Sequence, residues 1–518
     1  MMRSLVIAAA TSLTPEGVVE RLRTERGVML LRSFQLGEAS GETSGANSHS
    51  RYSFVVARPF LRFRSFGSRC EIRSDDGTHV QFGNPWHLLD ALMSRCELLD
   101  QIDFPFPLGG CFGYWGYDLK NFVESKLPRN AVNDLELPDC CVGFYGSVVV
   151  FDHRLGKTWI VSTGLDADGS RSEPRARQEL EFWQARLQHH DEHSTNAGRE
   201  HPARPAHSPA STVFNPTSRA GETPAPRTPR ADEPPVLHSN LSRADFISRV
   251  EQAQAYIRLG HVYQVNLSHR LSVASDLDGW ALFQNLAAVS PAPFAAYLDC
   301  GDFQVAGSSP ELFLRLSGRS IVTRPIKGTR PRSADPTRDA QLTYELQTST
   351  KEMSELVMIT DLLRNDLGRV CEFGTVQVPE LVRLERYAQV QHLVSTVEGR
   401  LRSGVTHFAA FSSSFPGGSV TGAPKIRAME IIDELEPNTR GPYTGALGYL
   451  GFNRESQLSI VIRTAITKGG TAHFHAGAGI VSDSVPAAEY DETMAKAGGF
   501  ISALGWPVPA RGGRQTPA

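Results

Sequence analysis

The sequence predicts an α+β protein built as two lobes. A chain of 518 residues is long for one compact core, because single cores rarely grow beyond roughly 250–300 residues. The first part of the chain contains strand candidates with alternating apolar residues, and the second part mixes strand and helix patterns. A long stretch with few large apolar residues separates the two parts. These observations place the boundary between the lobes at residues 189–237.

The first lobe, residues 1–188, is predicted to begin with a strand followed by a helix. The opening residues combine a basic side chain, a short apolar run and small residues, as a signal peptide does. The run is short, however, and Thr14-Pro15-Glu16 opens a helix directly after it, so strand and helix are the simpler interpretation. Further strands and a closing helix are predicted at Tyr52–Val56, Gly146–Phe151, Thr158–Val161 and 174–188.

Residues 189–237 are predicted to form a disordered linker. They are rich in Pro, Ser, Thr, Ala and His, and such a composition cannot bury enough surface to offset chain entropy. The second lobe, residues 238–507, opens with a helix that carries a capping pattern, Ser242 followed by Asp245, and that ends at Gly260. Residues 508–518 are predicted to be a disordered tail.

Composition excludes several classes of function. A net charge of −3 gives no reason to expect nucleic acid or an anionic membrane as a partner. No stretch reaches the 18 or so apolar residues that a membrane-spanning helix needs. The seven cysteines show no CxxC spacing, and their odd number does not suggest a disulfide framework. A cytoplasmic location is therefore expected.

Residues 324–332, Arg-Pro-Ile-Lys-Gly-Thr-Arg-Pro-Arg, contain a candidate nucleophile, Lys327. Glycine and proline predict a rigid turn here, and the flanking arginines are expected to push the amine toward its neutral form. At a reference pKa of about 10.4, roughly one lysine in 2,500 is neutral at pH 7, so a nucleophilic role requires such a push. A solvated basic loop is the alternative interpretation.

Two acidic pairs have the spacing of one helix face. Glu352 and Glu355 form the first pair, and Glu489 and Glu492 form the second. Because residues i and i+3 share a face, each pair can direct two carboxylates at one point. Two such helices facing each other would offer the hard oxygen ligands that Mg²⁺ prefers. The alternative is a solvated helix face, which spacing alone does not overturn.

A glycine-rich segment at residues 415–430 is predicted to be a flexible loop that leads into a helix with Pro424 in its first turn. The exposed N–H groups of such a loop suit an anion. The segment is not a Walker A loop, because Gly422 is followed by Ala-Pro rather than by Lys and Ser or Thr.

A second glycine segment, Gly477-Ala478-Gly479, follows two strand candidates at 458–467 and 471–476. Arg463 lies in the first of these strands, and its guanidinium can hold a carboxylate through two hydrogen bonds. A tight turn and a surface arginine are the alternative interpretations of these two features.

Two further patterns are rejected as functional sites. Gly109–Gly113 has the Gly-x-Cys-x-Gly form of a glutaminase nucleophile elbow, but Pro105 and Pro107 interrupt the strand that an elbow needs. Its possible partner, His190, lies at the edge of the predicted linker. His473 and His475 share a strand face without a third metal ligand in view, so they are interpreted as structural histidines.

Taken together, these segments resemble the chorismate-utilising enzymes, which include anthranilate synthase component I, aminodeoxychorismate synthase component I, and the isochorismate and salicylate synthases. The resemblance covers 238–500 in order and is looser in the first lobe, around Ser33 and Gly109–Asp118. It implies two lobes around a β-sandwich core with surrounding helices. The matching segments are Gly260–Ser268, Ser290–Tyr297, Ser309–Glu311, Arg324–Arg332, Asp361–Asp366, Gln391–Ser395, Gly417–Lys425, Gly477–Gly479 and Glu489–Lys496.

Position 327 distinguishes members of this family. Anthranilate and isochorismate synthases typically carry Ala in the corresponding Pro-Ile-Ala-Gly-Thr-Arg motif, whereas aminodeoxychorismate synthases carry Lys. The chain therefore resembles aminodeoxychorismate synthase component I, which makes 4-amino-4-deoxychorismate from chorismate and ammonia for 4-aminobenzoate and folate synthesis. Anthranilate synthase component I, an enzyme of tryptophan synthesis, is the closest alternative. A catalytically silent regulator that binds chorismate or tryptophan, and a bifunctional synthase-glutaminase, are weaker alternatives.

The resemblance also implies roles for individual residues. Lys327 would attack C2 of chorismate, and Glu311 would protonate the departing C4 hydroxyl, for which its pKa must be raised. Glu355 and Glu492 would be the principal Mg²⁺ ligands, supported by Glu352 and Glu489. The chorismate pocket would be lined by Gly328, Thr329, Tyr443, Arg463, Gly477, Ala478, Gly479 and Lys496, with His392 and Thr421 nearby.

Two partners besides chorismate follow from the resemblance. Some family members bind tryptophan in the sandwich, and the matching positions are Ser33, Pro293 and Phe294. Anthranilate synthases usually read Leu-Glu-Ser where this chain reads Leu31-Arg32-Ser33, so feedback inhibition by tryptophan is not expected. Ammonia would come from a separate glutamine amidotransferase subunit.

Overall fold

The structure is a computed structural model and describes residues 3–34, 51–101, 104–188, 236–387 and 389–505. Apart from residues 236–237, the predicted linker lies outside the described residues, and so does the predicted tail at 508–518. None of the helices in the described ranges is long and apolar enough to cross a membrane.

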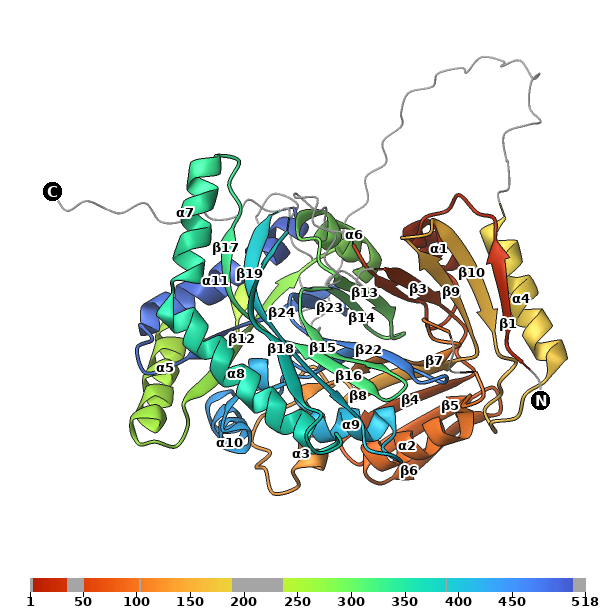
Figure 1. The fold of residues 1–518 in the computed structure, drawn as a ribbon, viewed down its shortest axis with the longest axis horizontal. Helices are drawn as coiled ribbons and strands as arrows, with labels where there is room; N and C mark the ends of the chain where they lie inside the picture. The colour runs from red at the N-terminus through yellow and green to blue at the C-terminus, as the bar shows by residue number, and fades with distance from the viewer. Residues whose placement is uncertain (1–2, 35–50, 102–103, 189–235, 388, 506–518) are drawn as a thin grey trace, which may run out of the picture.

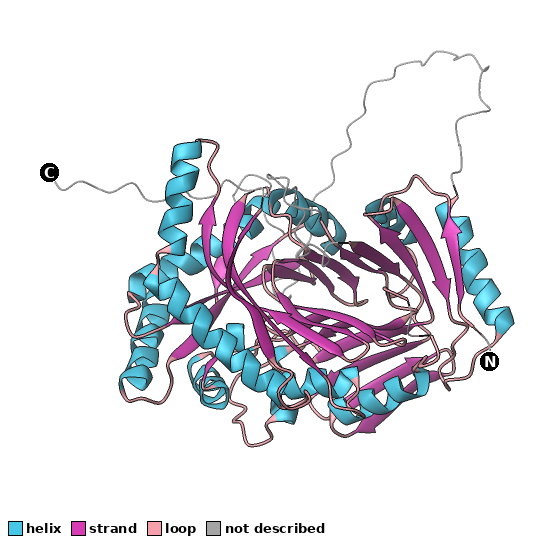
Figure 2. Ribbon diagram, viewed as in Figure 1, coloured by secondary structure: helices cyan, strands magenta, loops and turns pink. Residues whose placement is uncertain are grey.

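Two large antiparallel sheets form the centre of the molecule, and helices lie around them (Figure 2). The first sheet runs in the order β1 (Leu5–Ala9), β10 (Lys157–Ser162), β9 (Ser147–Asp152), β3 (Tyr52–Val56), β2 (Met29–Arg32), β13 (Phe294–Asp299), β14 (Gln304–Ser309), β23 (Thr464–Lys468), β24 (Thr471–Ile480), β12 (Gln264–Ala274) and β11 (His238–Ser239), with β20 (Gly422–Ala423) also paired to β12.

The second sheet contains the strand that carries Lys327 at one end of its order. That order is β17 (Ile326–Pro331), β19 (Val390–Arg400), β16 (Ser320–Arg324), β15 (Leu312–Ser317), β22 (Glu455–Ile460), β21 (Ala446–Gly451), β7 (Gly110–Trp115), β8 (Cys140–Tyr145), β4 (Leu61–Phe66), β5 (Arg69–Ser74) and β6 (Gly77–Phe82), with β18 (Gln377–Arg386) also paired to β19.

Both sheets combine strands from before and after residues 189–237. In the first sheet, β2 pairs with β13, and in the second, β7 pairs with β21. The inner faces of the two sheets meet in one apolar core, where the rings of Phe54 and Tyr449 lie 5.1 Å apart. The predicted α+β fold with a β-sandwich core is confirmed.

The helices in the described residues are α1 (Pro15–Leu22), α2 (Pro85–Cys96), α3 (Lys120–Val123), α4 (Glu173–Leu187), α5 (Arg243–Arg258), α6 (Gly279–Val289), α7 (Pro336–Gln347), α8 (Thr350–Gly368), α9 (His407–Ser414), α10 (Lys425–Leu435) and α11 (Pro486–Ala503), with short 3₁₀ turns η2 (Tyr117–Leu119) and η3 (Gly418–Val420). The predicted capping box of α5 is present, because the Ser242 hydroxyl accepts from the Asp245 N–H and the Asp245 carboxylate accepts from the Ser242 N–H.

Two helices bring the acidic pairs to the same region. α8 packs on β17 and β19, and α11 packs on β24 of the other sheet (Figure 1). A small apolar cluster of Leu346, Leu356 and Leu393 fixes α7 and α8 against β19. The edge of the second sheet, the long strand β24 and both acidic helices are thereby held around one place in the fold.

Candidate active site

Lys327 lies in a strand at the edge of the second sheet. It is the register partner of Leu393 in the antiparallel pairing of β17 with β19. Gly328 then interrupts the register with a φ of +73°, and pairing resumes between Thr329 and His392. The predicted turn was therefore wrong. Glycine and proline produce a bulge in a strand here, because β19 offers a pairing partner that the local sequence does not reveal.

The Lys327 ammonium is held between a backbone carbonyl and a carboxylate. Nζ donates a hydrogen bond to the carbonyl oxygen of Ser419 at 3.2 Å and lies 3.8 Å from Oε2 of Glu355. The lysine side chain is only 14% exposed. The side chain is thus largely enclosed, and these two contacts fix the position of its amine.

The arginines that flank Lys327 in sequence do not face it as charges. Arg324 pairs with Glu385, and Arg330 pairs with Glu352 at 3.3 Å. Both guanidinium groups thus pair with carboxylates of other elements. The charged neighbour of Lys327 is the carboxylate of Glu355, at 3.8 Å.

Glu311 is buried beside Lys327, immediately before β15. Its side chain is about as enclosed as a core residue, with 5% exposure. Burial raises the pKa of Glu311 to about 7, against the opposing effects of a hydrogen bond from the Ser419 hydroxyl and the charge of Lys327. A carboxyl group with this pKa is partly protonated at neutral pH, which is what proton donation from this position requires.

The bulge at Gly328 is tightly packed. A Cβ at this position would lie 2.8 Å from Cδ1 of Leu346 and 3.1 Å from Oε2 of Glu352. We expect Gly328→Ala to lower the free energy of unfolding by roughly 2–4 kcal/mol, because it combines a positive φ with overpacking. Gly318 is the matched control, since its φ is +54° but no atom lies within 4 Å of its Cβ position.

Gly318→Ala should therefore show only the conformational part of the loss, about 1 kcal/mol. Urea unfolding of both variants followed by circular dichroism measures the difference. Equal losses in the two variants would show that the bulge has room for a side chain.

The glycine-rich segment is buried rather than exposed. Residues 415–423 are all buried, and they form η3 and β20 before α10 begins. Pro424 is the N-cap of α10 and not part of its first turn. The flexible loop was a wrong prediction: a Cβ on Gly418 would lie 2.5 Å from Leu362, so the glycine serves close packing. Thr421 is fully buried, and its hydroxyl donates to the Gly417 carbonyl at 2.8 Å.

The four glutamates predicted to bind Mg²⁺ come from α8 and α11, as expected, and each has a cationic neighbour. Burial raises the pKa of Glu355, which Lys327 lowers and the carboxylates of Glu352 and Glu492 raise further. The two helices therefore bring their carboxylates close enough to repel each other. The other cation pairs are Arg330–Glu352 at 3.3 Å, Lys351–Glu489 at 3.7 Å and Lys496–Glu492 at 2.7 Å.

These carboxylates do not form a ready-made metal cage. Among the described residues, no group of three or more His, Cys, Asp and Glu side chains is arranged to hold a metal ion. Mg²⁺ is commonly bound by one or two carboxylates together with waters and substrate oxygens. The mutual repulsion of Glu355 and Glu492 is what a cation between them would relieve. The donor set thus fits an ion that binds together with a substrate.

Arg463 lies at the corner where the chain passes from β22 of the second sheet to β23 of the first, with a φ of +50°. The prediction that it lies within one continuous strand was wrong, because the chain changes sheets at 461–463. Burial and the Arg463 charge lower the pKa of His392 to about 4. His392 Nδ1 and the Thr329 hydroxyl share a hydrogen bond of 2.8 Å. Arg463 and His392 line one cavity with an empty volume of about 480 Å³.

The segment Gly477–Gly479 lies inside β24 rather than in a turn after it. A Cβ on Gly477 would lie 2.7 Å from the Tyr443 hydroxyl oxygen, and one on Gly479 would lie 3.9 Å from Nζ of Lys327. Lys496 Nζ donates to the Gly477 carbonyl at 2.8 Å. This strand therefore connects the predicted pocket residues of α11 to the candidate nucleophile.

Two residues beside Lys327 were missed by the sequence analysis. Ser419 contacts both Lys327 and Glu311. Gln264 is 2% exposed, its amide nitrogen lies against Gly479, and its Oε1 has no hydrogen-bond partner among the described residues. A polar side chain between the apolar residues of β12 was the available signal for Gln264. Ser419 was missed because the glycine-rich segment around it was interpreted as a flexible loop.

The rejected patterns are structural within the described residues. Cys111 is buried in β7, and burial raises the pKa of its thiol well above the ordinary value, so it is a poor nucleophile. His190 lies outside the described residues. His475 stacks on Tyr443 with ring centroids 5.0 Å apart, and His473 shares a hydrogen bond with the Ser272 hydroxyl.

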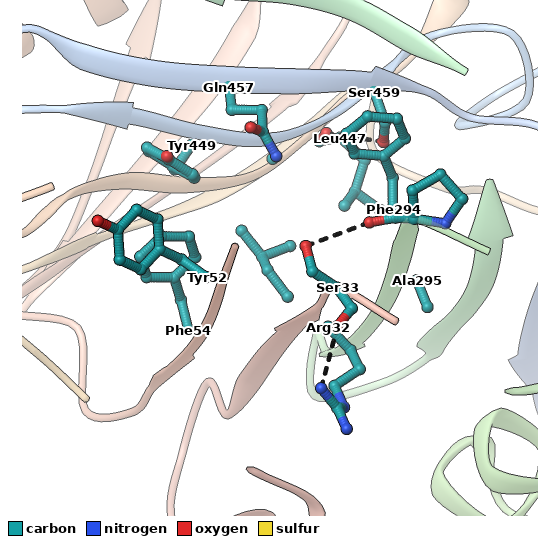
Figure 3. Close-up of a pocket in the computed structure, with 13 residues that line it drawn as sticks. Arg32, Ser33, Tyr52, Phe54, Phe294, Ala295, Leu447, Tyr449, Gln457 and Ser459 are labelled. Atoms are coloured by element: carbon teal, nitrogen blue, oxygen red, sulfur yellow. Dashed lines mark hydrogen bonds between the residues drawn. The ribbon is translucent and has the colours of Figure 1, made fainter. Parts of the chain in front are cut away.

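The residues predicted for tryptophan, Ser33, Pro293 and Phe294, line one pocket between the two sheets (Figure 3). The Ser33 hydroxyl donates to the Pro293 carbonyl at 3.3 Å. The pocket has an empty volume of about 330 Å³. Its other walls are aromatic, aliphatic and polar side chains, among them Tyr52, Phe54, Leu447, Tyr449, Gln457 and Ser459. Arg32, which also lines the pocket, pairs with Glu16 at 2.6 Å.

Comparison with known proteins decides the family. Residues 51–502 match the chorismate binding enzymes. The chain belongs to this family. It is a chorismate-utilising enzyme, and the family resemblance predicted from the sequence motifs is confirmed.

Relatives within the family carry two different names. Anthranilate synthase component 1 of Thermus thermophilus is 39% identical over 445 residues, which are 85% of this chain and 87% of that protein. Aminodeoxychorismate synthase component 1 of Klebsiella aerogenes is 36% identical over 459 residues, which are 88% of this chain and 91% of that protein. The solved structure of anthranilate synthase component I from Streptococcus pneumoniae matches with a TM-score of 0.70 and 28% identity, covering 90% of this chain and 95% of that chain.

Proposed function

We propose that this protein is aminodeoxychorismate synthase component I, which converts chorismate and ammonia to 4-amino-4-deoxychorismate in 4-aminobenzoate and folate synthesis. The observation that carries the proposal is Lys327, whose amine lies beside the buried carboxyl group of Glu311 and 3.8 Å from the carboxylate of Glu355. A nucleophile, a proton donor and an anionic group are thus combined in one enclosed place.

The proposed chemistry uses Lys327 and Glu311 in sequence. The Lys327 amine attacks C2 of chorismate, both ring double bonds shift, and the C4 hydroxyl departs as water with a proton from Glu311. Ammonia then adds at C4, both double bonds shift back, and the C2–nitrogen bond to Lys327 breaks. Glu311 suits the first step because its pKa of about 7 leaves a proton available.

The substrate's carboxylates match the polar groups around the amine. Arg463 and Lys496 supply positive charge, and the Thr329 hydroxyl with neutral His392 supplies hydrogen-bonding groups. The remaining proposed pocket residues are Gly328, Thr421, Tyr443, Gly477, Ala478 and Gly479.

The direct test is to incubate the purified protein with chorismate, Mg²⁺ and ammonium at mildly alkaline pH and to identify the product by liquid chromatography–mass spectrometry. Aminodeoxychorismate without pyruvate is the expected result. Anthranilate with pyruvate would instead identify anthranilate synthase component I. That second candidate is favoured by the 39% identity to the Thermus thermophilus enzyme.

A separate glutamine amidotransferase subunit is the proposed ammonia donor, in a cytoplasmic complex. The relatives named above are components 1 of their enzymes, which supports a second subunit. Glutamine alone should then give no product with this chain, whereas ammonium should.

Mg²⁺ is the proposed cofactor, held by Glu355 and Glu492 with support from Glu352 and Glu489. When bound, the ion would hold a substrate carboxylate and offset the anionic charge that faces Lys327. We expect Glu355→Gln to raise the Mg²⁺ concentration for half-maximal activity at least about 10-fold. Calorimetric titration of Mg²⁺ in the presence of chorismate should show the same weakening. Glu251→Gln, on the exposed face of α5, is the control and should change neither measurement.

Tryptophan is the proposed occupant of the pocket at Ser33, Pro293 and Phe294. Its lining combines aromatic and aliphatic side chains with a few polar groups, as small-molecule sites do. We expect tryptophan to raise the melting temperature of the protein, and Ser33→Ala to weaken its binding about 10-fold through the lost hydroxyl. Ser162→Ala, at a buried serine of β10, should leave binding unchanged. If tryptophan does not change the melting temperature of the wild-type protein, the proposal that this pocket binds tryptophan is wrong.

A further inference from the structure

A pair of cysteines outside the candidate active site connects the two sheets. Cys141 lies in β8 of the second sheet, and Cys300 directly follows β13 of the first. The thiols of Cys141 and Cys300 share a hydrogen bond. Both residues line one cavity with an empty volume of about 400 Å³. The proposed chorismate chemistry uses neither thiol.

Arg64 places a fixed positive charge beside both sulfurs. It is the register partner of Cys141 across β4 and β8. Its guanidinium donates to the Cys300 carbonyl oxygen and pairs with Asp302 at 2.8 Å. These contacts hold the guanidinium next to Cys300. A cation and a thiol donor are the surroundings that stabilise a thiolate.

The effect on the two thiols is opposite. The hydrogen bond with Cys300 and the charge of Arg64 lower the pKa of Cys141, although burial and the Asp302 carboxylate act against them. The same hydrogen bond and burial raise the pKa of Cys300. Cys141 is thus arranged as an attacking thiolate and Cys300 as a thiol that keeps its proton until a second step.

Cys141 also differs from the other cysteines in access. It is partly exposed, whereas the other six are buried. Burial raises the pKa of Cys70 and Cys371 to about 11 and of Cys96 to about 12. A small oxidant that enters the cavity therefore meets one reactive sulfur first, with a second sulfur in contact with it.

We propose that Cys141 and Cys300 are a peroxide-sensitive pair that closes into a disulfide between the two sheets. The Cys141 thiolate attacks one oxygen of hydrogen peroxide, the O–O bond breaks, and the leaving hydroxide takes up a proton to become water. The Cys300 sulfur then attacks the Cys141 sulfenic acid, the S–O bond breaks, and the hydroxyl leaves with the thiol proton as a second water. Two thiols and one peroxide give one disulfide and two waters, so sulfur is oxidised and peroxide is reduced.

The test uses the full chain, reduced and then freed of reductant, treated with about one equivalent of hydrogen peroxide and alkylated. We expect the intact mass before alkylation to fall by two hydrogens and peptide mapping after alkylation to show one Cys141–Cys300 link, which dithiothreitol reverses. The other cysteines should remain free thiols. A link through neighbouring Cys140, or oxidation of Cys141 no faster than that of Cys70 and Cys371, overturns the proposal.

Three variants separate the steps. Cys300→Ser should stop at a sulfenic acid on Cys141, which dimedone traps. Arg64→Gln should slow the oxidation of Cys141 roughly 10-fold by removing the charge that supports its thiolate. Cys140→Ser is the matched control, since Cys140 is a buried neighbour in the same strand, and it should leave the link and its rate unchanged. If Cys300→Ser fails to fold, the peptide map of the wild-type chain still decides.

Discussion

Replacing Lys327 with alanine should reduce formation of aminodeoxychorismate from chorismate and ammonium on the order of 1,000-fold or more. The amine is the proposed covalent nucleophile, and no other lysine shares its contacts with Ser419 and Glu355 among the described residues. Product formation is measured by liquid chromatography–mass spectrometry at saturating Mg²⁺. The wild-type chain with chorismate alone should also gain the mass of chorismate minus one water, and Lys327→Ala should not.

Lys157→Ala is the matched control for this prediction. Lys157 is an exposed lysine in a strand, β10, of the first sheet, so its loss should leave turnover unchanged. Retained turnover in Lys327→Ala would remove the covalent step from the proposal. Release of anthranilate and pyruvate by Lys327→Ala would instead identify the protein as an enzyme of tryptophan synthesis.

The elements that the sequence predicted well are those specified by nearby residues. The α5 capping box needs only Ser242 and Asp245, three residues apart. The helical i and i+3 spacing placed Glu352 with Glu355 and Glu489 with Glu492 on two helices. In each case the interaction that forms the element lies within one turn, so short-range pattern is sufficient.

The errors occurred where a distant strand decides the local structure. Lys327 is in a strand because β19, more than sixty residues later in the chain, pairs with it. Arg463 is at a corner because the chain exchanges one sheet for the other there, and both flanking strands find partners from distant segments. Strand pairing and sheet membership are tertiary properties, which periodicity does not encode.

The candidate site shows the same division. The residue types that carry the chemistry were found from motifs, but their electrostatic relations were not. The sequence neighbours of Lys327 are arginines, whereas its neighbour in space is Glu355. Ser419, which contacts both Lys327 and Glu311, became visible only once β17 and the buried glycine segment were placed together.

Replacing Glu311 with glutamine should lower turnover by roughly 10²–10⁴-fold while it stabilises the protein at alkaline pH. Burial raises the pKa of Glu311 from 4.5 to about 7 in the folded chain. Between these two values the native state holds a proton that the unfolded state has released. The free energy of unfolding contributed by this group therefore falls as pH rises from about 4.5 to about 7.

Above that window the wild-type protein carries a buried carboxylate whose unfavourable contribution is on the order of 3 kcal/mol. Glutamine keeps the shape without the charge, so Glu311→Gln should unfold at higher urea than the wild type at pH 8 and at a similar concentration near pH 4. At a fixed concentration of free ammonia, wild-type turnover should decline above about pH 7, where the proton donor is lost.

Glu455 supplies the matched control, because burial also raises its pKa to about 7 and it lies in β22 away from Lys327. Glu455→Gln should flatten the dependence of stability on pH in the same direction but leave turnover intact. A protein that becomes more stable and less active at once cannot have lost activity by unfolding. Only Glu311→Gln should show that combination, and a stable, active Glu311→Gln would remove proton donation by this residue from the proposed chemistry.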